Sequence, residues 1–248
     1  MKRKKVAFFD FTCCEGCQLQ VANFGEALLD VLEAVDVVEF REVMSEKADE
    51  YDVAIIEGSI TTPHDVERIK DIRSRSKVMI AYGSCATIGG INGMKNSFKM
   101  DDVKSYVYGE SGKYFETIPT MSVGQVVDVD YFVNGCPIYP PEFVKILKYA
   151  LMGIPYTVKD EAVCVECKAN ENECMYEIGL TCMGPITNAG CNSWCVNNGN
   201  ICYGCRGMVK ETTKNASVEV LKKYDIPIDW IMGKYDMYNK SSESEDMK

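Results

Sequence analysis

The chain has 248 residues, with 27 lysines and arginines against 37 aspartates and glutamates, a net charge of -10 and 13 cysteines. This length is sufficient for a hydrophobic core, so disulfides are not needed for folding, and the acidic balance argues against a nucleic-acid partner. Thirteen cysteines exceed what core packing requires, and their distribution therefore needs a chemical explanation.

The N-terminal sequence bears on the redox compartment. The basic start, MKRKK, is followed by a short apolar run that ends at Asp10, with no small-residue cleavage site, so no export signal is expected. No uncharged apolar segment reaches the about 18 residues that span a bilayer. We therefore expect a cytoplasmic protein with no membrane span, where an odd number of cysteines favours metal ligation over disulfides.

Up to about residue 155, short β-rich runs alternate with helical segments, which is the pattern of a parallel sheet with crossover helices. Between the first two strands, residues 17–34 carry apolar side chains at helical spacing and are expected to form core. The five predicted strands lie at 5–11, 35–40, 52–58, 77–83 and 128–135.

Two further helices are predicted to begin with proline. Thr62 precedes Pro63 as a helix N-cap, and a second helix begins at Pro140 and is expected to end at Gly153. Because both helices follow strands, the fold class of residues 1–157 is predicted to be α/β, with a doubly wound parallel sheet.

Composition changes after this domain. The residues from Cys164 to Cys205 include eight cysteines together with Gly, Asn and Pro, and they show no sustained helical or strand period. Such a segment cannot bury enough apolar surface to order itself, and it needs another source of stability. We expect a second, irregular cysteine-rich domain at 158–248, with a polar tail from Tyr235 that is frayed or docked on a partner.

Four cysteines of the first domain follow predicted strands. Cys14 and Cys17 come after the first strand, Cys85 after the fourth and Cys136 after the fifth. Ligands of an open α/β sheet bind outside the carboxyl ends of the strands, so these four thiols are expected to meet at one place. Flanking glycines let the backbone approach a bulky cofactor. The set fits a 4Fe-4S cluster, with a Zn(Cys)4 site as the alternative.

The eight later cysteines divide by sequence proximity into two sets of four. Two iron-sulfur clusters would supply the cohesion that this segment lacks, and two zinc ions are the alternative. Three four-cysteine sites favour a series of redox centres, because a chain of clusters moves electrons whereas a chain of structural zinc ions has no comparable role. The first set is Cys164, Cys167, Cys174 and Cys182, and the second is Cys191, Cys195, Cys202 and Cys205.

Seven motifs over nearly the whole chain carry a family resemblance. In order they are CEGC, EGSITT, YGSCATIGGI, NGCPIYPPE, CVECK, CMYEIGLTCMGPITNAGC and CYGC. They resemble the small, iron-sulfur subunit of nickel-iron hydrogenases. The similarity is greatest to the cytoplasmic multi-subunit branch of archaea and bacteria, which includes sulfhydrogenase-type, F420-reducing and heterodisulfide-reductase-linked enzymes.

The resemblance implies a flavodoxin-like first domain and three 4Fe-4S clusters. In exported members the first distal ligand is histidine and one medial position is proline, whereas Cys164 and Cys195 stand at those positions here. The resemblance assigns the proximal cluster to Cys14, Cys17, Cys85 and Cys136, the medial cluster to Cys191, Cys195, Cys202 and Cys205, and the distal cluster to Cys164, Cys167, Cys174 and Cys182.

The function implied is that of an electron-transfer subunit in an oxidoreductase complex. Electrons would pass between the nickel-iron site of a separate large subunit and a flavin or iron-sulfur subunit on the NADP, F420 or heterodisulfide reductase side. The chain alone is not expected to activate hydrogen. The terminal acceptor and the direction of catalysis do not follow from the sequence.

Two other functions remain as alternatives. A relative of the quinone-reductase small subunit would share the fold and a tandem pair like Cys13 and Cys14, but that family normally carries one cluster. A cysteine-rich zinc scaffold is the other alternative.

Three single residues stand apart from the cysteine sets. Cys13 is expected to be a buried spare thiol, and His64, the only histidine, a surface or capping residue. Glu15, between two proximal ligands, is a candidate for a proton route into the large subunit, with a solvated or backbone-bonding carboxylate as the alternative.

Overall fold

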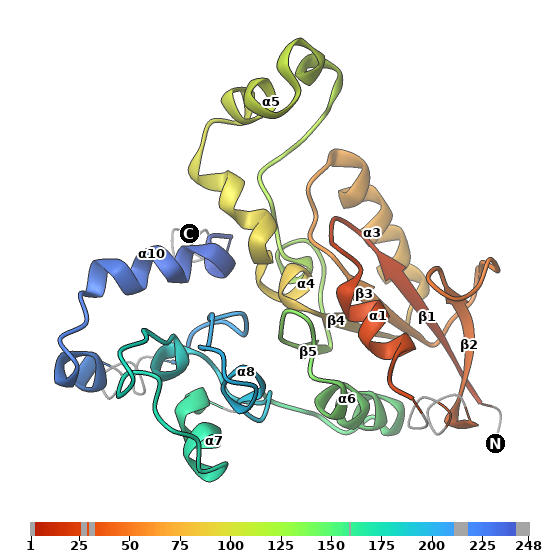
Figure 1. Cartoon of the computed structure of the whole chain (residues 1–248). Helices are drawn as coiled ribbons and strands as arrows, with labels where there is room; N and C mark the ends of the chain where they lie inside the picture. The colour runs from red at the N-terminus through yellow and green to blue at the C-terminus, as the bar shows by residue number, and fades with distance from the viewer. Residues whose placement is uncertain (1–2, 26–28, 30–32, 159, 211–217, 242–248) are drawn as a thin grey trace.

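The computed structural model describes residues 3–25, 29, 33–158, 160–210 and 218–241. Its centre is a five-stranded parallel sheet with the strand order β2-β1-β3-β4-β5, which is the flavodoxin-like doubly wound order (Figure 1). The predicted fold class is confirmed. The strands are β1 (Lys4–Asp10), β2 (Val35–Phe40), β3 (Val53–Glu57), β4 (Val78–Tyr82) and β5 (Tyr131–Val133).

The central strands are apolar on both faces, because helices cover both sides of the sheet. Val6 and Phe8 of β1 point into one core with helices α1 (Gly16–Ala22) and α6 (Pro140–Met152), whereas Ala7 and Phe9 point into the other with α3 (Pro63–Arg75). This alternation follows from the two-residue period of a strand. The sheet is therefore a rigid base, and the loops that follow its strands lie at its carboxyl edge.

The helix predicted over residues 17–34 is interrupted after Ala22. Helix α1 ends at Ala22, and the chain turns through Asn23 to Gly25, which has a left-handed φ of 63°. Of the rest of the predicted helix, residues 26–28 and 30–32 lie outside the described residues, and Leu29, Glu33 and Ala34 are helical. By contrast, α6 begins at Pro140 and is capped by Gly153 at a φ of 68°, as predicted.

The start of α3 carries a complete capping box. The hydroxyl of Thr62 accepts the Asp65 N–H at 3.1 Å, and the Asp65 carboxylate accepts the Thr62 N–H at 2.9 Å. Substitution Thr62→Ala is expected to lower the free energy of unfolding by about 1 kcal/mol, because the N-cap oxygen is lost. Denaturant unfolding measures this change. As a control, Ser74→Ala on the exposed face of α3 should stay within about 0.5 kcal/mol of the parent; equal losses in both variants would contradict a specific capping role.

Between β4 and β5 the chain makes a long excursion that was not predicted from the sequence. It contains α4 (Ser84–Ile88), η1 (Gly90–Ser97), α5 (Met100–Tyr108), η2 (Gly109–Tyr114) and η3 (Val123–Gln125). Figure 1 shows α5 projecting away from the sheet, whereas α4 lies at its carboxyl edge. The excursion therefore begins at the predicted cofactor edge.

The cysteine-rich segment is largely turns, as predicted, with α7 (Val163–Ala169), η4 (Gly184–Ile186) and α8 (Trp194–Asn197). It nevertheless has a small apolar core, in which Val163 and Met183 pack with residues from beyond Cys205. Leu221, Ile231 and Tyr235 are these contributors, the last two from helix α10 (Ile228–Asn239). The expectation that the segment lacks packing was therefore incomplete, because later residues supply part of its core.

The tail prediction was wrong for residues 235–241. Helix α10 packs on η1 and α4, and the backbone oxygen of Ser241 accepts a hydrogen bond from Gln125 Nε2 at 2.9 Å. Polar composition did not prevent docking, because the polar groups are paired inside the same chain. Residues 242–248 lie outside the described part.

The division of the chain at residue 157 stays a prediction. Across the described residues, none of the helices combines the length and the apolar character needed to cross a bilayer.

Candidate functional site

The carboxyl edge of the sheet gathers the four cysteines of the first domain. Cys14 lies in the loop after β1, Cys17 in the first turn of α1, Cys85 in α4 directly after β4, and Cys136 just after β5. Burial, followed by the neighbouring Cys136 and Cys14 thiols, raises the pKa of Cys85 to about 12. Cys17 also lies close enough to Cys136 to interact with it electrostatically. The structure thus brings this set together.

Two glycines make room for these thiols. Gly83, at a φ of 84°, would place a Cβ atom 2.5 Å from the Cys17 Sγ, and Gly90, at a φ of 57°, would place one 3.0 Å from the Cys85 Sγ. Both residues also have a positive φ, which strongly favours glycine. The thiols are therefore held against bare backbone, as the flanking glycines in the sequence suggested.

A buried carboxylate that was not predicted as a site residue supports the same loop. Glu57, at the end of β3, is 2% exposed and accepts the backbone N–H groups of Cys17 at 3.0 Å and Gln18 at 2.9 Å. Burial raises the pKa of Glu57, while these hydrogen bonds act in the opposite direction. Its sequence signals were a single acidic residue closing the apolar run VAIIE and the EGSITT motif that begins with this residue. Glu57 fixes the start of α1 and hence the position of Cys17.

The three single residues have different surroundings. Cys13 is half-buried, and its pKa is raised by burial and by the nearby Glu57. Glu15 adopts a φ of 60°, and a hydrogen bond with the Glu42 carboxyl raises the pKa of Glu15. His64 is exposed in the first turn of α3, which is the surface position expected for it.

The first set of later cysteines also meets at one place. Burial, followed by the thiols of Cys182, Cys167 and Cys174, raises the pKa of Cys164 to about 12. Gly184 lies against this set, since its Cβ would be 3.3 Å from the Cys164 Sγ and 3.5 Å from the Cys182 Sγ. These four thiols therefore form a second group around a close backbone approach.

The remaining set lies between the other two. Cys205 interacts with Cys136 of the first domain and with Cys191, and Cys195 interacts with Cys191, Cys182 and Cys136. The backbone N–H of Cys202 donates to the Cys182 Sγ at 3.2 Å. A cavity of about 80 Å³ lies beside Cys136 of the first-domain set, and its lining also includes Cys191, Cys195, Cys205 and Trp194. The three sets thus form a continuous series.

The thiols are free and spread out within each set. All 13 cysteines are unbridged. Within the part of the chain that the structure describes, no three His, Cys, Asp or Glu side chains are grouped as a single metal ion requires.

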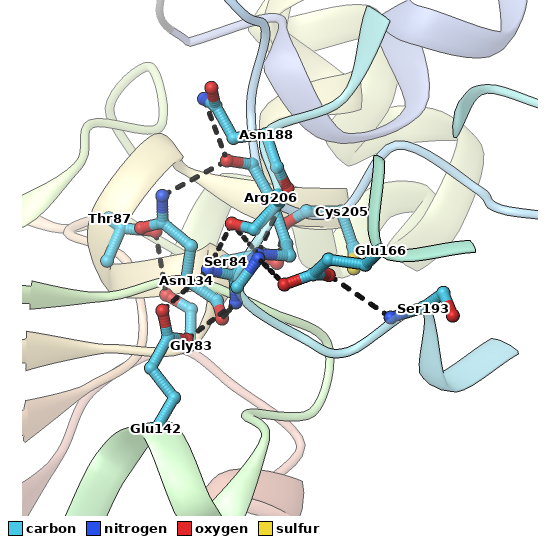
Figure 2. Close-up of polar contacts among 12 residues, drawn as sticks. Gly83, Ser84, Thr87, Asn134, Glu142, Glu166, Asn188, Ser193, Cys205 and Arg206 are labelled. Carbon is cyan, nitrogen blue, oxygen red and sulfur yellow. Dashed lines mark hydrogen bonds and ion pairs between the residues drawn. The ribbon is translucent and has the colours of Figure 1, made fainter. Parts of the chain in front are cut away.

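A buried ion pair joins the cysteine-rich segment to the sheet. Arg206, directly after Cys205, is 1% exposed and forms two hydrogen bonds of 2.8 Å with Glu142 of α6. Figure 2 shows that Arg206 and its neighbours connect the loop after β5 with the loop that carries Cys205. The guanidinium also donates to the backbone oxygens of Asn134, Asn188 and Ala189. Neither partner of this pair was predicted to have a role.

Additional contacts hold the Cys205 loop. The hydroxyl of Ser84, next to Cys85, donates to the Cys205 carbonyl, and Asn134 Nδ2 donates to the Arg206 carbonyl at 3.0 Å (Figure 2). Ser84 and Asn134 lie next to two first-domain cysteines. These bonds therefore fix the distance between the first-domain set and the set that contains Cys205.

Comparison with known proteins gives this arrangement a family. The model of the NADH ubiquinone oxidoreductase, 20 Kd subunit, family matches residues 14–150, which is more than half of the chain. The sulfhydrogenase 2 subunit delta of Pyrococcus furiosus is 36% identical over 88% of this chain and 92% of its own length. This chain belongs to the NADH ubiquinone oxidoreductase, 20 Kd subunit, family, on the branch of the hydrogenase small subunits.

Other relatives and solved structures support the same family assignment. A subunit of the F420-non-reducing hydrogenase vhu of Methanococcus voltae is 32% identical over 82% of each chain. The fold is shared with a chain of an NAD+-reducing [NiFe]-hydrogenase, with a TM-score of 0.56, 22% identity, and coverage of 63% of this chain and 96% of that one. An actinobacterial-type NiFe-hydrogenase from Ralstonia eutropha gives a TM-score of 0.57 at 16% identity, over 91% of this chain and 90% of that one.

The extent of the matches separates the hydrogenase branch from the quinone-reductase branch. The family model ends at residue 150, before the eight later cysteines, whereas the hydrogenase relatives extend over most of the chain. The chain therefore has the electron-transfer role of a hydrogenase small subunit, in an oxidoreductase complex.

Proposed function

We propose that this small subunit relays electrons through three 4Fe-4S clusters, between a nickel-iron site in a separate large subunit and a flavin or iron-sulfur subunit. The observation that carries the proposal is the unbroken series of three four-thiol sets. The proximal ligands are Cys14, Cys17, Cys85 and Cys136; the medial ligands are Cys191, Cys195, Cys202 and Cys205; and the distal ligands are Cys164, Cys167, Cys174 and Cys182.

The residues present fit such clusters. Each set offers four thiols, and glycine backbone at Gly83, Gly90 and Gly184 leaves space directly beside the sulfur atoms. Buried thiols resist ionisation, and a bound iron-sulfur cluster would stabilise them as thiolates while supplying one-electron redox chemistry. Thirteen unbridged thiols also support a reducing, cytoplasmic location.

The chain's own residues hold this series in place. Glu57 fixes Cys17 through two backbone N–H groups, and Arg206 fixes the Cys205 loop relative to the Cys136 loop. These contacts keep the proximal and medial sets at a constant separation. A constant separation matters for electron transfer, because the positions of the donor and the acceptor then need no adjustment during the reaction.

The exposed thiol of Cys14 suggests where the large subunit binds. Cys14 is exposed at the carboxyl edge of the sheet, and Leu19 and Ile91 near the same edge are exposed apolar side chains. An interface there would bury the proximal set. We propose the opposite end of the series, at the distal set, as the exit towards the flavin or iron-sulfur subunit on the NADP, F420 or heterodisulfide reductase side.

Metal and sulfide analysis of the anaerobically purified complex tests the proposal. We expect about 12 iron atoms and about 12 inorganic sulfides for each copy of this chain, because three cubane clusters contain that number. Substitution Cys174→Ser should remove or alter one cluster, whereas Cys13→Ser, the matched control, should leave the iron content unchanged. Stoichiometric zinc without sulfide would replace this function by a zinc scaffold, and a content of one cluster would favour the quinone-reductase type.

A further inference from the structure

One carboxylate of the distal set reaches the loop that carries a proposed medial ligand. Glu166 lies in α7, inside the CVEC motif, and is half-buried. Its Oε1 accepts the backbone N–H of Gly190 at 2.9 Å, and its Oε2 accepts the backbone N–H of Ser193 at 3.1 Å. Figure 2 shows the contact with Ser193. Because Gly190 and Ser193 lie on either side of Cys191, a residue of the distal motif holds the loop of the medial set.

That loop contains a tight turn with an unfavourable backbone. The N–H of Trp194 donates to the Cys191 carbonyl at 3.2 Å, and the two residues between them, Asn192 and Ser193, have φ values of 52° and 50°. Positive φ at both central positions is the pattern of a type I′ turn, which favours asparagine followed by glycine. Serine stands at the second position here, and the left-handed conformation is unfavourable for it. The turn therefore depends on contacts from outside it.

A second side chain from the same segment also binds the turn. Asn170, the C-cap of α7, donates through Nδ2 to the Asn192 carbonyl at 3.0 Å and to the Ser193 hydroxyl at 2.9 Å. Ser193 is 1% exposed, and its hydroxyl donates to Asn197 Oδ1 at 2.7 Å. The distal segment thus contacts the backbone N–H, the carbonyl and the hydroxyl groups of the turn.

The conformation of this turn determines where two proposed medial ligands point. Cys191 is the first residue of the turn and Cys195 follows it, and both line the cavity of about 80 Å³ together with Cys205. A turn of another type would send the chain in another direction after Cys191. Cys195 would then no longer face the same cavity.

We propose that Glu166 is a positioning residue for the medial cluster, whose carboxylate holds the left-handed turn in the conformation that presents Cys191 and Cys195 to one cluster. The inference rests on the proposed function, since these two cysteines must be medial ligands. Loss of the carboxylate should therefore weaken the medial cluster, although Glu166 lies in the distal motif.

The size of the effect follows from the two hydrogen bonds that are lost. Hydrogen bonds from backbone N–H groups to a carboxylate are about twice as strong as those between neutral groups. Without them, the turn can relax towards a negative φ, and the two thiols then leave the geometry that binds one cluster. The medial cluster should release its iron more readily, while all four of its thiols remain in the chain.

The test uses Glu166→Ala in the anaerobically purified hydrogenase complex, challenged with an iron chelator. We expect one cluster to release iron about tenfold faster than in the parent, because the loss of even one hydrogen bond to a charged group accounts for about that factor. Electron paramagnetic resonance identifies the cluster. The signal that disappears first should be the one altered by Cys205→Ser; earlier loss of the signal altered by Cys174→Ser would contradict the inference.

A second change tests whether the turn is the cause. Position 192 is exposed, and Asn192→Gly makes its left-handed φ less costly. Added to Glu166→Ala, this change should slow iron release from the medial cluster by roughly threefold relative to Glu166→Ala alone. Glycine in this loop would not repair a general weakening of α7, so the absence of any recovery would overturn the role of the turn.

Glu173→Ala is the matched control. Glu173 is exposed and directly precedes Cys174, so this change removes a negative charge beside the distal set and leaves both hydrogen bonds of Glu166 in place. Its iron release should equal that of the parent. Equal acceleration in Glu173→Ala and Glu166→Ala would attribute the effect to charge alone and would overturn the inference.

Glu166→Gln covers the case in which Glu166→Ala fails to assemble. It keeps the length of the side chain and one acceptor oxygen, so its iron release should be faster than in the parent and slower than in an assembled Glu166→Ala. A rate equal to that of the parent in whichever variant assembles, with full iron content, would overturn the inference and leave the proposed function intact. Absence of iron and sulfide from the parent complex would instead refute the proposed function.

Discussion

Substitution Arg206→Met is expected to destabilise the subunit by about 3 to 5 kcal/mol, because it leaves the Glu142 carboxylate buried without its partner. Three backbone oxygens, those of Asn134, Asn188 and Ala189, would also lose a donor. The expected result is a marked fall in the thermal midpoint of the purified complex, or loss of the subunit from it. The measurement is thermal unfolding under anaerobic conditions, with the yield of assembled complex.

Two further variants separate the ion pair from other effects of the substitution. The double change Glu142→Leu with Arg206→Met should restore much of the lost stability, since removing both charges of a buried pair is often near neutral. Arg41→Met is the surface control. Arg41 pairs with Asp10 at 2.6 Å, but its side chain is 69% exposed, so its loss should cost no more than about 1 kcal/mol. A double variant as unstable as Arg206→Met would show that Arg206 acts mainly through the backbone oxygens.

Substitution Gly83→Ala is expected to remove the proposed proximal cluster. The new Cβ atom would lie 2.5 Å from the Cys17 Sγ, and the φ of 84° disfavours any side chain at this position. Either the backbone or the thiol must move, and Cys17 is a proposed ligand. We expect the iron content to fall from about 12 to about 8 atoms per chain, with the sulfide content falling in parallel.

The control for this variant is Gly124→Ala. Gly124 has an ordinary backbone conformation, and an added Cβ would meet only the ring of Phe132, at 3.7 Å. Its iron content should match the parent. If Gly83→Ala retained the full iron content as well, then Cys17 would not be held against this glycine in the loaded protein, and its place in the proximal set would be in doubt.

Local sequence patterns were sufficient to predict the sheet and to predict how the cysteines are grouped. Strand positions were predicted to within a few residues, because alternating and continuous apolar runs are local properties. The capping pattern at Thr62 and the terminating Gly153 were equally local. The parallel order of the strands then implied one common edge, and this was enough to predict that Cys14, Cys17, Cys85 and Cys136 lie together.

The other residues that support these cysteines were evident from the three-dimensional fold alone. Glu57 lies 40 positions from Cys17, Glu142 lies 64 positions from Arg206, and Ser84 lies 121 positions from Cys205. None of these pairs has a periodic signal, because each depends on the path of the backbone between its members. A charged or polar residue in a motif is compatible with a solvated surface until the fold shows that it is buried. For that reason the cysteine sets could be recognised from the sequence, whereas the contacts that hold them at fixed separations could not.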